Sequence, residues 1–580
     1  MATLTGQPTT IDATIKVCSV EELEHDRVRV VAASGRSVAV FIDEGRVYGV
    51  DNRCPHMGFP LAQGTVKDGI LTCHWHHAKF DLAGGCTFDL FADDVTSFRA
   101  EIRDGDVWLD PTPLEEDPRT HWLRKVDEGL EHDVPLVLAK AMIGLEDGDT
   151  REVLTKAALF GVRNRDDGWS DGLSILTAMS NILPSLDPDD RPIALFHALV
   201  HVARATAGQS VNFDLLPLDT DETRPERYVE WTRRFVEVRA SEPTERALAT
   251  MIDIGVPEAS VGDAIFGAST DHLFMDIGHT LDFSNKAFEL LDHIGWDQAD
   301  EVLTSLVPNL VTAQRMEETS SWQHPVNLPE LLSGLYEGLD ELIEVGGGTL
   351  SEWDGHATLA DQILDGEPTD TLGVMAELVR SGVPLQDMSA SVAYAAGMRL
   401  VHFRVTNEFA DWNTVHHTFT YTNAVDQAMR RAPSNPLARG IFDGAMSVYL
   451  ERFLNVPKQA IPRPSGDTPS REAVLETFDV QGGVDETAQL VADMLVAGDR
   501  DAVIRLLGHA LLREDAGFHS FQVYEAGVRQ YGNFVGTPEG DNILIGVSRF
   551  LSAHSPTVRQ RGQTFEIAAR LHRGESLAGE

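Results

Sequence analysis

Basic residues and cysteines are scarce in this sequence, and each shortage excludes a class of protein. The chain of 580 residues has 47 Lys and Arg against 91 Asp and Glu, so its formal net charge is −44. Because the neutralisation of phosphates needs a basic face, we expect no nucleic-acid partner and no binding to an anionic membrane surface. Four cysteines in so long a chain cannot form a disulfide framework.

Signals for membrane insertion and secretion are also missing. No apolar run approaches the ~20 residues that span a bilayer. Residues 1–15 lack the basic start and the apolar stretch of a secretory signal peptide. We therefore expect a cytoplasmic protein without a membrane span.

Several cofactor motifs are absent as well. No Gly-x-Gly-x-x-Gly opens a helix, so a built-in nicotinamide-binding domain is not indicated. No Cys-x-x-Cys-His is present for haem attachment. No Glu-x-x-His occurs after residue 120, which argues against a carboxylate-bridged di-iron bundle. Electrons for any redox chemistry are therefore expected from a separate reductase or ferredoxin.

Two short motifs carry the strongest chemical signal in the sequence. Cys54-Pro55-His56 is followed, after sixteen residues, by Cys73-His74-Trp75-His76. Each motif offers one thiol and one imidazole, so each loop supplies one ligand to each iron of a two-iron cluster. The competing interpretation is a Cys2His2 zinc site. Zinc motifs usually pair Cys with Cys and His with His, so the alternating order favours the cluster.

The residues around these motifs resemble the Rieske ferredoxin family. The matching stretches are Cys54 to Gly58, Leu61, Gly64, Gly69 to His76, Ala78, and Phe80-Asp81. The resemblance implies an antiparallel β domain and a [2Fe-2S] cluster held by Cys54, His56, Cys73 and His76. His56 and His76 would bind the outer iron, where electrons enter and leave. One departure is His77, where the family usually has Gly.

The remainder of the chain predicts a second, larger domain. Strand-like segments at 28–31, 38–42, 47–50, 97–102 and 107–109 give way, after residue 110, to a Pro-rich acidic stretch. Periodicity then becomes helical, with segments such as 190–206, 270–294, 298–316, 387–405, 412–431 and 515–530. We predict a small antiparallel all-β Rieske domain at 12–112, a linker at 113–120 and an all-helical domain at 121–580.

Histidines are the candidate ligands for a second metal in the helical domain. His197 and His201 lie four residues apart in an apolar segment, so both rings share one face of a buried helix. The pair either binds a metal or consists of two core histidines with protein partners. The other candidate ligands, which are individually better explained as ordinary structural residues, are His272, Asp276, His279, His402, His416, His417, Asp515 and His519. Three of them begin a polar stripe along one predicted helix, a pattern typical of a solvent-facing helix surface. The stripe consists of His272, Asp276, His279, Asp282, Lys286, Glu289 and His293.

The standard catalytic domain of ring-hydroxylating oxygenases is not indicated. Its mononuclear iron motif is Asp-x2-His-x4-His, and no two histidines here are five positions apart. Two short pieces, Arg191 to His201 and His416 to Ala424, instead resemble the questin oxidase-like family. That resemblance implies oxidation of an organic, polycyclic substrate.

These observations lead to two hypotheses of different classes. The first is an oxygen-dependent monooxygenase with a Rieske cluster and a second, non-haem iron site among the helices. The second is an electron-transfer or redox-sensing protein whose helical region is a metal-free docking scaffold. The number of irons per chain separates them.

Overall fold

The computed structural model describes residues 14–114, 117–145, 148, 150–350, 353–575 and 577. The predicted start of the β domain at residue 12, and residues 115 and 116 of the predicted linker, lie outside this range. The chain forms two compact units, one of residues 1–149 with 563–580 and one of residues 150–562. We call them the cluster unit and the helical unit.

The cluster unit is built on a six-stranded antiparallel sheet of order β1-β9-β8-β4-β3-β2. Its strands are β1 (Ile15–Ser19), β2 (Val28–Ala33), β3 (Arg36–Asp43), β4 (Arg46–Asp51), β8 (Ser97–Arg103) and β9 (Asp106–Pro113). A short helix, α1 (Val20–Asp26), begins with a capping box in which Ser19 and Glu22 bond each other's backbone N–H groups. Tight turns at Gly35, Gly45 and Gly105, each with positive φ, join the hairpins and fix their register.

A second, three-stranded sheet carries the second ligand motif, while the first motif follows β4 of the larger sheet. Its order is β5 (Thr65–Lys67), β6 (Ile70–Thr72) and β7 (Lys79–Asp81), all antiparallel. Buried residues from both sheets, including Phe41, Val50, Leu71 and Phe80, form one apolar cluster that also contains Cys54 and Cys73. The thiols are therefore positioned by the packed core and not by a flexible loop.

Two helices follow the sheet within the cluster unit. They are α2 (Pro118–Glu131) and α3 (Pro135–Gly144), and each begins with a proline at its first position. Gly129 lets them approach closely, because a Cβ there would lie 2.5 Å from a methyl carbon of Leu138. The C-terminal helix α25 (Gln560–His572) begins in the helical unit and ends in the cluster unit.

The helical unit contains α-helices and short 3-10 turns in its described residues. Its helices are α4 (Thr150–Arg163), α5 (Asp171–Ile182), α6 (Arg191–Thr206), α7 (Pro225–Glu237), α8 (Ser241–Asp253), α9 (Glu258–Thr270), α10 (His279–Ile294), α11 (Ala299–Thr304), α12 (Val307–Thr312), α13 (Ser320–Gln323), α14 (Leu328–Gly346), α15 (His356–Asp365), α16 (Pro368–Arg380), α17 (Leu385–Val401), α18 (Trp412–Arg431), α19 (Asn435–Leu450), α20 (Arg471–Thr477), α21 (Val484–Val496), α22 (Arg500–Leu512), α23 (Phe518–Asn533) and α24 (Pro538–Ala553). The predicted fold class, a small antiparallel β domain followed by a large helical region, is confirmed.

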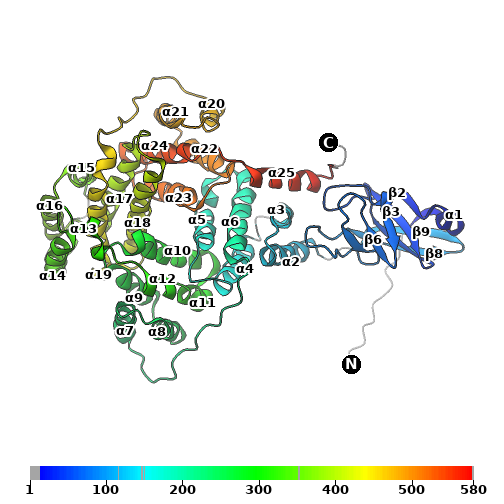
Figure 1. The fold of residues 1–580 in the computed structure, drawn as a ribbon, viewed down its shortest axis with the longest axis horizontal. Helices are drawn as coiled ribbons and strands as arrows, with labels where there is room; N and C mark the ends of the chain where they lie inside the picture. Colours follow the sequence, from blue (N-terminus) through cyan, green and yellow to red (C-terminus); the bar gives the residue numbers. More distant parts are fainter. Residues whose placement is uncertain are drawn as a thin grey trace. The chain divides into compact units, whose positions relative to one another are not determined.

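Four helices at the centre of the helical unit form a closed ring (Figure 1). α10 packs against α5 and α18, and α23 packs against the same two helices. The interior of the ring is therefore enclosed by segments that lie up to about 350 residues apart in the sequence. This enclosure brings distant polar side chains into one buried space.

The predicted helix over 270–294 is wrong in two respects. α9 ends at Thr270, and the chain passes through a 3-10 segment, η5 (Met275–Gly278), before α10 begins at His279. The polar stripe along α10 is also buried and not solvent-facing: Asp282, Lys286 and Glu289 are each at most 3% exposed. The predicted helix over 298–316 is likewise broken, into α11 and α12.

No helix in the described part of the chain combines the length and the apolarity that a bilayer crossing requires. This finding agrees with the absence of long apolar runs in the sequence.

Two candidate metal centres

The first ligand motif lies in a tight loop after β4. The N–H of Cys54 donates to the carbonyl of Phe59 over 2.8 Å, and the N–H of Gly58 donates to the carbonyl of Cys54 over 2.7 Å. Gly58 has φ +81°, a conformation that glycine adopts without strain. The sequence Cys-Pro-His-Met-Gly therefore closes on itself and directs Cys54 into the core and His56 toward its edge.

The second motif joins β6 to β7 in a similar loop. The N–H of Cys73 donates to the carbonyl of Ala78 over 2.8 Å. His77 has φ +64°, so it occupies the left-handed region that explains the family's usual glycine. The His77 side chain is exposed.

Four donor groups come together between these loops. Cys54 and Cys73 are buried, reduced and within hydrogen-bond reach of each other. The rings of His56 and His76 have their centroids 4.7 Å apart. The Nδ1 of His56 is buried and has no hydrogen-bond partner among the described residues. An unpartnered buried nitrogen beside two buried thiols fits a metal-ligand set.

The electrostatics of this site also suit metal binding. The two thiols act as a pair: their mutual hydrogen bond, with burial, raises the pKa of Cys54, whereas this bond and the backbone N–H groups of Trp75 and His76 lower the pKa of Cys73 to about 6. Burial, with smaller effects of His76 and Lys140, lowers the pKa of His56 to about 4. The thiolate and the neutral imidazole are the forms that bind metal.

One edge of the first site is accessible and apolar. His76 and Trp75 are exposed, and the ring of Phe91 lies 5.0 Å from that of His56. Phe88 and Leu90 next to it are also exposed. The imidazole side of the site is therefore the side that another redox group can approach.

Asp93, Asp94 and His121 form a further group with the spacing of metal ligands. Here the positive charge is already supplied by the protein. The ammonium of Lys125 lies 3.5 Å from Asp93 and 3.6 Å from Asp94, and Arg124 lies 3.1 Å from Asp94. A metal ion would be repelled by these cations, so we do not assign one here.

The second candidate centre lies in the helical unit, where three histidines converge. His279 begins α10, His417 is in the second turn of α18, and His519 is in the first turn of α23. One nitrogen from each lies within 4.8 Å of the others, and the Nε2 atoms of His417 and His519 are 3.2 Å apart. The Nε2 of His279 is buried without a partner among the described residues. These three residues form what we call the triple-histidine site.

Burial keeps the three imidazoles neutral at pH 7, the form in which a ring nitrogen can bind a metal. Burial and the neighbouring histidines lower the pKa of His417 to about 2 and that of His519 to about 4. Burial also lowers the pKa of His279, against a smaller raising effect of the Asp276 and Asp171 carboxylates. Carboxylates near neutral imidazoles are the surroundings that non-haem iron prefers.

The backbone before His279 is strained. Phe274, Asp276 and Ile277 have φ values of 41°, 49° and 50°, in the left-handed region that is unusual for non-glycine residues. Gly278 follows with φ 96°, and a Cβ there would lie 2.9 Å from the Cβ of Tyr421. Such strain persists only where the surroundings enforce it, and it is concentrated at functional sites.

His416 lies next to the triple-histidine site. Its ring centroid is 3.9 Å from that of His519, and its Nδ1 lies 3.1 Å from the carbonyl of Trp412. Its Nε2 is buried and unpartnered within the described residues. The adjacent pair His416-His417 thus contributes two neutral rings to one region.

The other predicted ligands lie elsewhere and have protein partners. The Nε2 of His197 is 3.2 Å from the carbonyl of Leu512, and the Arg561 guanidinium lies 3.3 Å from its Nδ1. His201 packs against Phe521, and the Arg561 charge lowers its pKa further after burial, to about 3. No third ligand completes this pair within the described part of the chain.

The remaining three residues are also satisfied locally. His272 lies 2.6 Å from both Glu237 and Glu317, and the Nδ1 of His402 lies 2.8 Å from the carbonyl of Gln459. Asp515 accepts the backbone N–H groups at the start of α25. The ligand role of these residues stays a prediction without support from their contacts.

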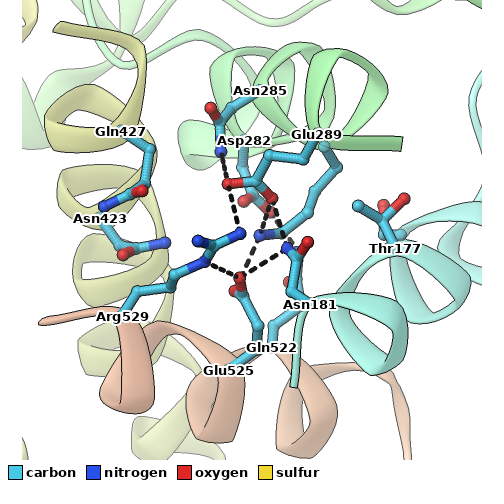
Figure 2. A network of polar contacts seen from close by, with 12 residues as sticks. Thr177, Asn181, Asp282, Asn285, Glu289, Asn423, Gln427, Gln522, Glu525 and Arg529 are labelled. Atoms are coloured by element: carbon cyan, nitrogen blue, oxygen red, sulfur yellow. Dashed lines mark hydrogen bonds and ion pairs between the residues drawn. The ribbon is translucent and has the colours of Figure 1, made fainter. Parts of the chain in front are cut away.

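The ring of α5, α10, α18 and α23 also encloses a polar core that the sequence analysis missed. Figure 2 shows side chains from all four helices pointing inward. Gln522 donates to Asp282, and the ammonium of Lys286 lies 2.8 Å from both Glu289 and Glu525. α23, like α10, carries polar residues at three- and four-residue spacings, and the presence of two such stripes was the sequence signal that could have revealed this core.

Comparison with known proteins identifies the cluster unit. The family described as Rieske [2Fe-2S] domain matches residues 13–99. The 3-phenylpropionate/cinnamic acid dioxygenase ferredoxin subunit of Photorhabdus laumondii is 30% identical over 16% of this chain and 90% of its own length. The chain therefore belongs to the Rieske [2Fe-2S] family. The domain implies a [2Fe-2S] cluster and a Rieske-type oxidoreductase.

Two other relatives match only through the same region. Apoptosis-inducing factor 3 of Homo sapiens is 31% identical over 16% of this chain and 16% of its own length. The 4beta-methylsterol monooxygenase of Methylococcus capsulatus is 42% identical over 11% of this chain and 18% of its own length. The chain thus spans less than a fifth of these two relatives, and they say nothing about the helical unit.

Proposed function

We propose that this chain is an oxygenase in which a Rieske cluster feeds electrons to a non-haem iron at the triple-histidine site. The observation that carries the proposal is the convergence of His279, His417 and His519, three neutral imidazoles from three different helices. Isolated buried imidazoles need partners, and a shared metal satisfies all three at once.

The first step is assigned to the cluster unit. Cys54 and Cys73 would hold one iron of the cluster, and His56 and His76 the other. The cluster, when bound, supplies one electron at a time. The chain's part is to bury the two thiolates, to stabilise them with backbone N–H groups, and to leave His76 exposed for electron exchange.

Iron is preferred over zinc at the triple-histidine site. Imidazole binds both metals, but zinc has no redox chemistry, so it could not accept the electrons that the Rieske cluster supplies. Iron would supply oxygen activation there. The protein contributes neutral ligands, a closed helical surrounding, and Asp276 and Asp171 as the nearby carboxylates that act on His279.

The partners follow from what the chain lacks and resembles. A separate reductase or ferredoxin would supply electrons, because the sequence has no nucleotide-binding motif. The substrate class, an organic and polycyclic molecule, is proposed from the resemblance to the questin oxidase-like family. Two relatives named as a monooxygenase and as the ferredoxin subunit of a dioxygenase support oxygenase chemistry by analogy.

Iron analysis of single-histidine variants tests this proposal. In His417→Ala and His519→Ala, the iron content should fall to that of the cluster alone, while the Rieske electron paramagnetic resonance signal stays unchanged. Cys73→Ser should do the reverse and abolish the cluster signal. His402→Ala is the matched control, because this partly buried imidazole of the same unit bonds a backbone carbonyl.

The same experiment discriminates the second candidate function. An unchanged iron content in His417→Ala and His519→Ala, with wild-type protein containing only the cluster irons, would overturn the oxygenase proposal. The chain would then be an electron-transfer or redox-sensing protein. The exposed apolar residues beside His56 and His76 favour docking of a redox partner in that case.

A further inference from the structure

A buried lysine from outside the Rieske domain reaches the loop that carries the first ligand motif. Lys140 lies on α3, beyond the residues 13–99 that match the family. Its Nζ donates a hydrogen bond to the carbonyl oxygen of Pro55, the residue between Cys54 and His56. The side chain is 7% exposed, so its ammonium group is withdrawn from bulk water.

Burying this ammonium is costly unless a negative charge compensates for it. The charged groups that act on it are Asp93 and Cys54, which favour the charged form, and Lys125 and Arg53, which oppose it. Asp93 is shared, because His121 lies 3.4 Å and Lys125 3.5 Å from the same carboxylate oxygen. Additional negative charge near Cys54 would therefore stabilise the charged form of Lys140.

We propose that Lys140 is a positioning residue that raises the reduction potential of the cluster through its buried positive charge. The inference rests on the ligand assignment made above for Cys54, His56, Cys73 and His76. Reduction adds one electron, and hence one negative charge, next to the ammonium. No bond forms or breaks. Burial lowers the pKa of Lys140, and the Asp93 carboxylate opposes this effect and favours the charged ammonium on which the proposed influence depends. The charge favours the reduced form and makes the cluster a better electron acceptor.

The structure also defines the competing role. The hydrogen bond to Pro55 holds the loop in place, and a purely structural lysine would act through this bond alone. The two roles separate chemically, because Lys140→Gln keeps an N–H donor but loses the charge. Lys140→Arg keeps both the donor and the charge.

A matched control comes from the second ligand loop. The Nζ of Lys79 lies 3.4 Å from the carbonyl of His77, as Lys140 contacts that of Pro55. The Lys79 side chain is 49% exposed, however, so water and salt screen its charge. Lys79→Gln therefore makes the same chemical change next to a ligand loop without burial.

The test is a potentiometric titration of the full chain followed by its electron paramagnetic resonance signal. In a medium of effective dielectric ~20, a unit charge about 12 Å away changes an electron-transfer equilibrium about tenfold, and a closer charge changes it more. Tenfold corresponds to about 59 mV for one electron. Because Lys140 contacts the ligand loop itself, we expect Lys140→Gln to lower the midpoint potential by at least about this amount. Lys140→Arg should retain the wild-type value, and Lys79→Gln should change it little.

A second variant tests the same idea with the opposite sign. Asp93→Asn removes the carboxylate that faces Lys140 and should raise the midpoint potential, whether or not Lys140→Gln assembles a cluster. Unchanged potentials in Lys140→Gln and Asp93→Asn, with intact signals, would overturn the proposal. Equal lowering in Lys140→Gln and Lys140→Arg would show that the geometry of the lysine contact with Pro55, and not the charge, sets the potential, and would also overturn the proposal. A wild-type protein without a Rieske signal would instead refute the ligand assignment itself.

Discussion

Replacing Lys286 with methionine removes the central cation of the polar core inside the four-helix ring. Lys286 is 1% exposed, and its ammonium lies 2.8 Å from Glu289 on its own helix and 2.8 Å from Glu525 on α23. Methionine has a similar length and no charge. The variant therefore leaves two buried carboxylates with Arg529 as the remaining cation that contacts both.

The pKa of Glu289 gives the size of the effect. Burial alone would raise this pKa, but the Lys286 charge, Arg529 and the hydrogen bonds from Lys286 and Asn181 outweigh burial and lower it from 4.5 to about 2. A shift of this size corresponds to about 3 kcal/mol of folding stability. Removal of one partner from a buried ion pair typically costs about 3–5 kcal/mol. We expect a loss within that range at pH 7.

The sign of the pH dependence follows from the same pKa. Because the folded-state pKa of Glu289 is lowered, its contribution to stability is present above pH 4.5 and is lost as the pH falls toward 2. In Lys286→Met, burial dominates and the carboxylate becomes easier to protonate. The difference between wild type and variant should therefore be largest at neutral pH and should shrink below pH 4.5.

Urea unfolding followed by far-ultraviolet circular dichroism, at pH 7 and at pH 4, measures both effects. Lys286→Met with Glu525→Gln should recover part of the loss, because one uncompensated charge is removed. Lys458→Met is the matched control, since Lys458 pairs with Asp365 at the surface and should contribute at most about 1 kcal/mol. A loss below that value, or an equal loss at both pH values, would refute the reasoning.

Two further predictions concern the cluster unit. Gly85 has φ +81°, and a Cβ there would lie 2.0 Å from the carbonyl oxygen of Val95, so Gly85→Ala should lower the melting temperature and the cluster content. Gly45→Ala, at φ +76° with nothing within 4 Å, should show only the conformational cost of about 1 kcal/mol, and equal effects of the two variants would contradict this. Separately, a nicotinamide cofactor should not reduce the isolated chain until a reductase is added. Rapid reduction, monitored by cluster absorbance without added flavin, would disprove it.

The cluster motifs were predictable because their geometry is local. Cys54 and His56, or Cys73 and His76, need only a tight loop to present one sulfur and one nitrogen, and loops of this length are encoded by neighbouring residues. The positive φ of His77 was not predictable in the same way. It reflects closure of the loop by the Cys73–Ala78 hydrogen bond and not a preference of histidine.

The long helices were predictable from periodicity, but their burial was not. α10 carries a polar stripe that satisfies the rule for a solvent-facing helix. The rule fails here because α5 and α23 present matching polar groups, so that the stripe of α10 pairs with them inside the ring. The sequence shows which face of a helix is polar, but it does not show whether water or another polar helix packs against that face.

The same limitation explains the outcome for the histidines. The spacing of His197 and His201 predicts two rings on one face, and both belong to one buried helix. What decides their chemistry is Arg561, more than 350 residues later, whose positive charge disfavours a metal at that face. His279, His417 and His519 lie far apart in the sequence, yet the His417 ring contacts both of the other two neutral imidazoles. The sign of the charge opposite a histidine, which only the tertiary structure supplies, therefore distinguishes the two groups.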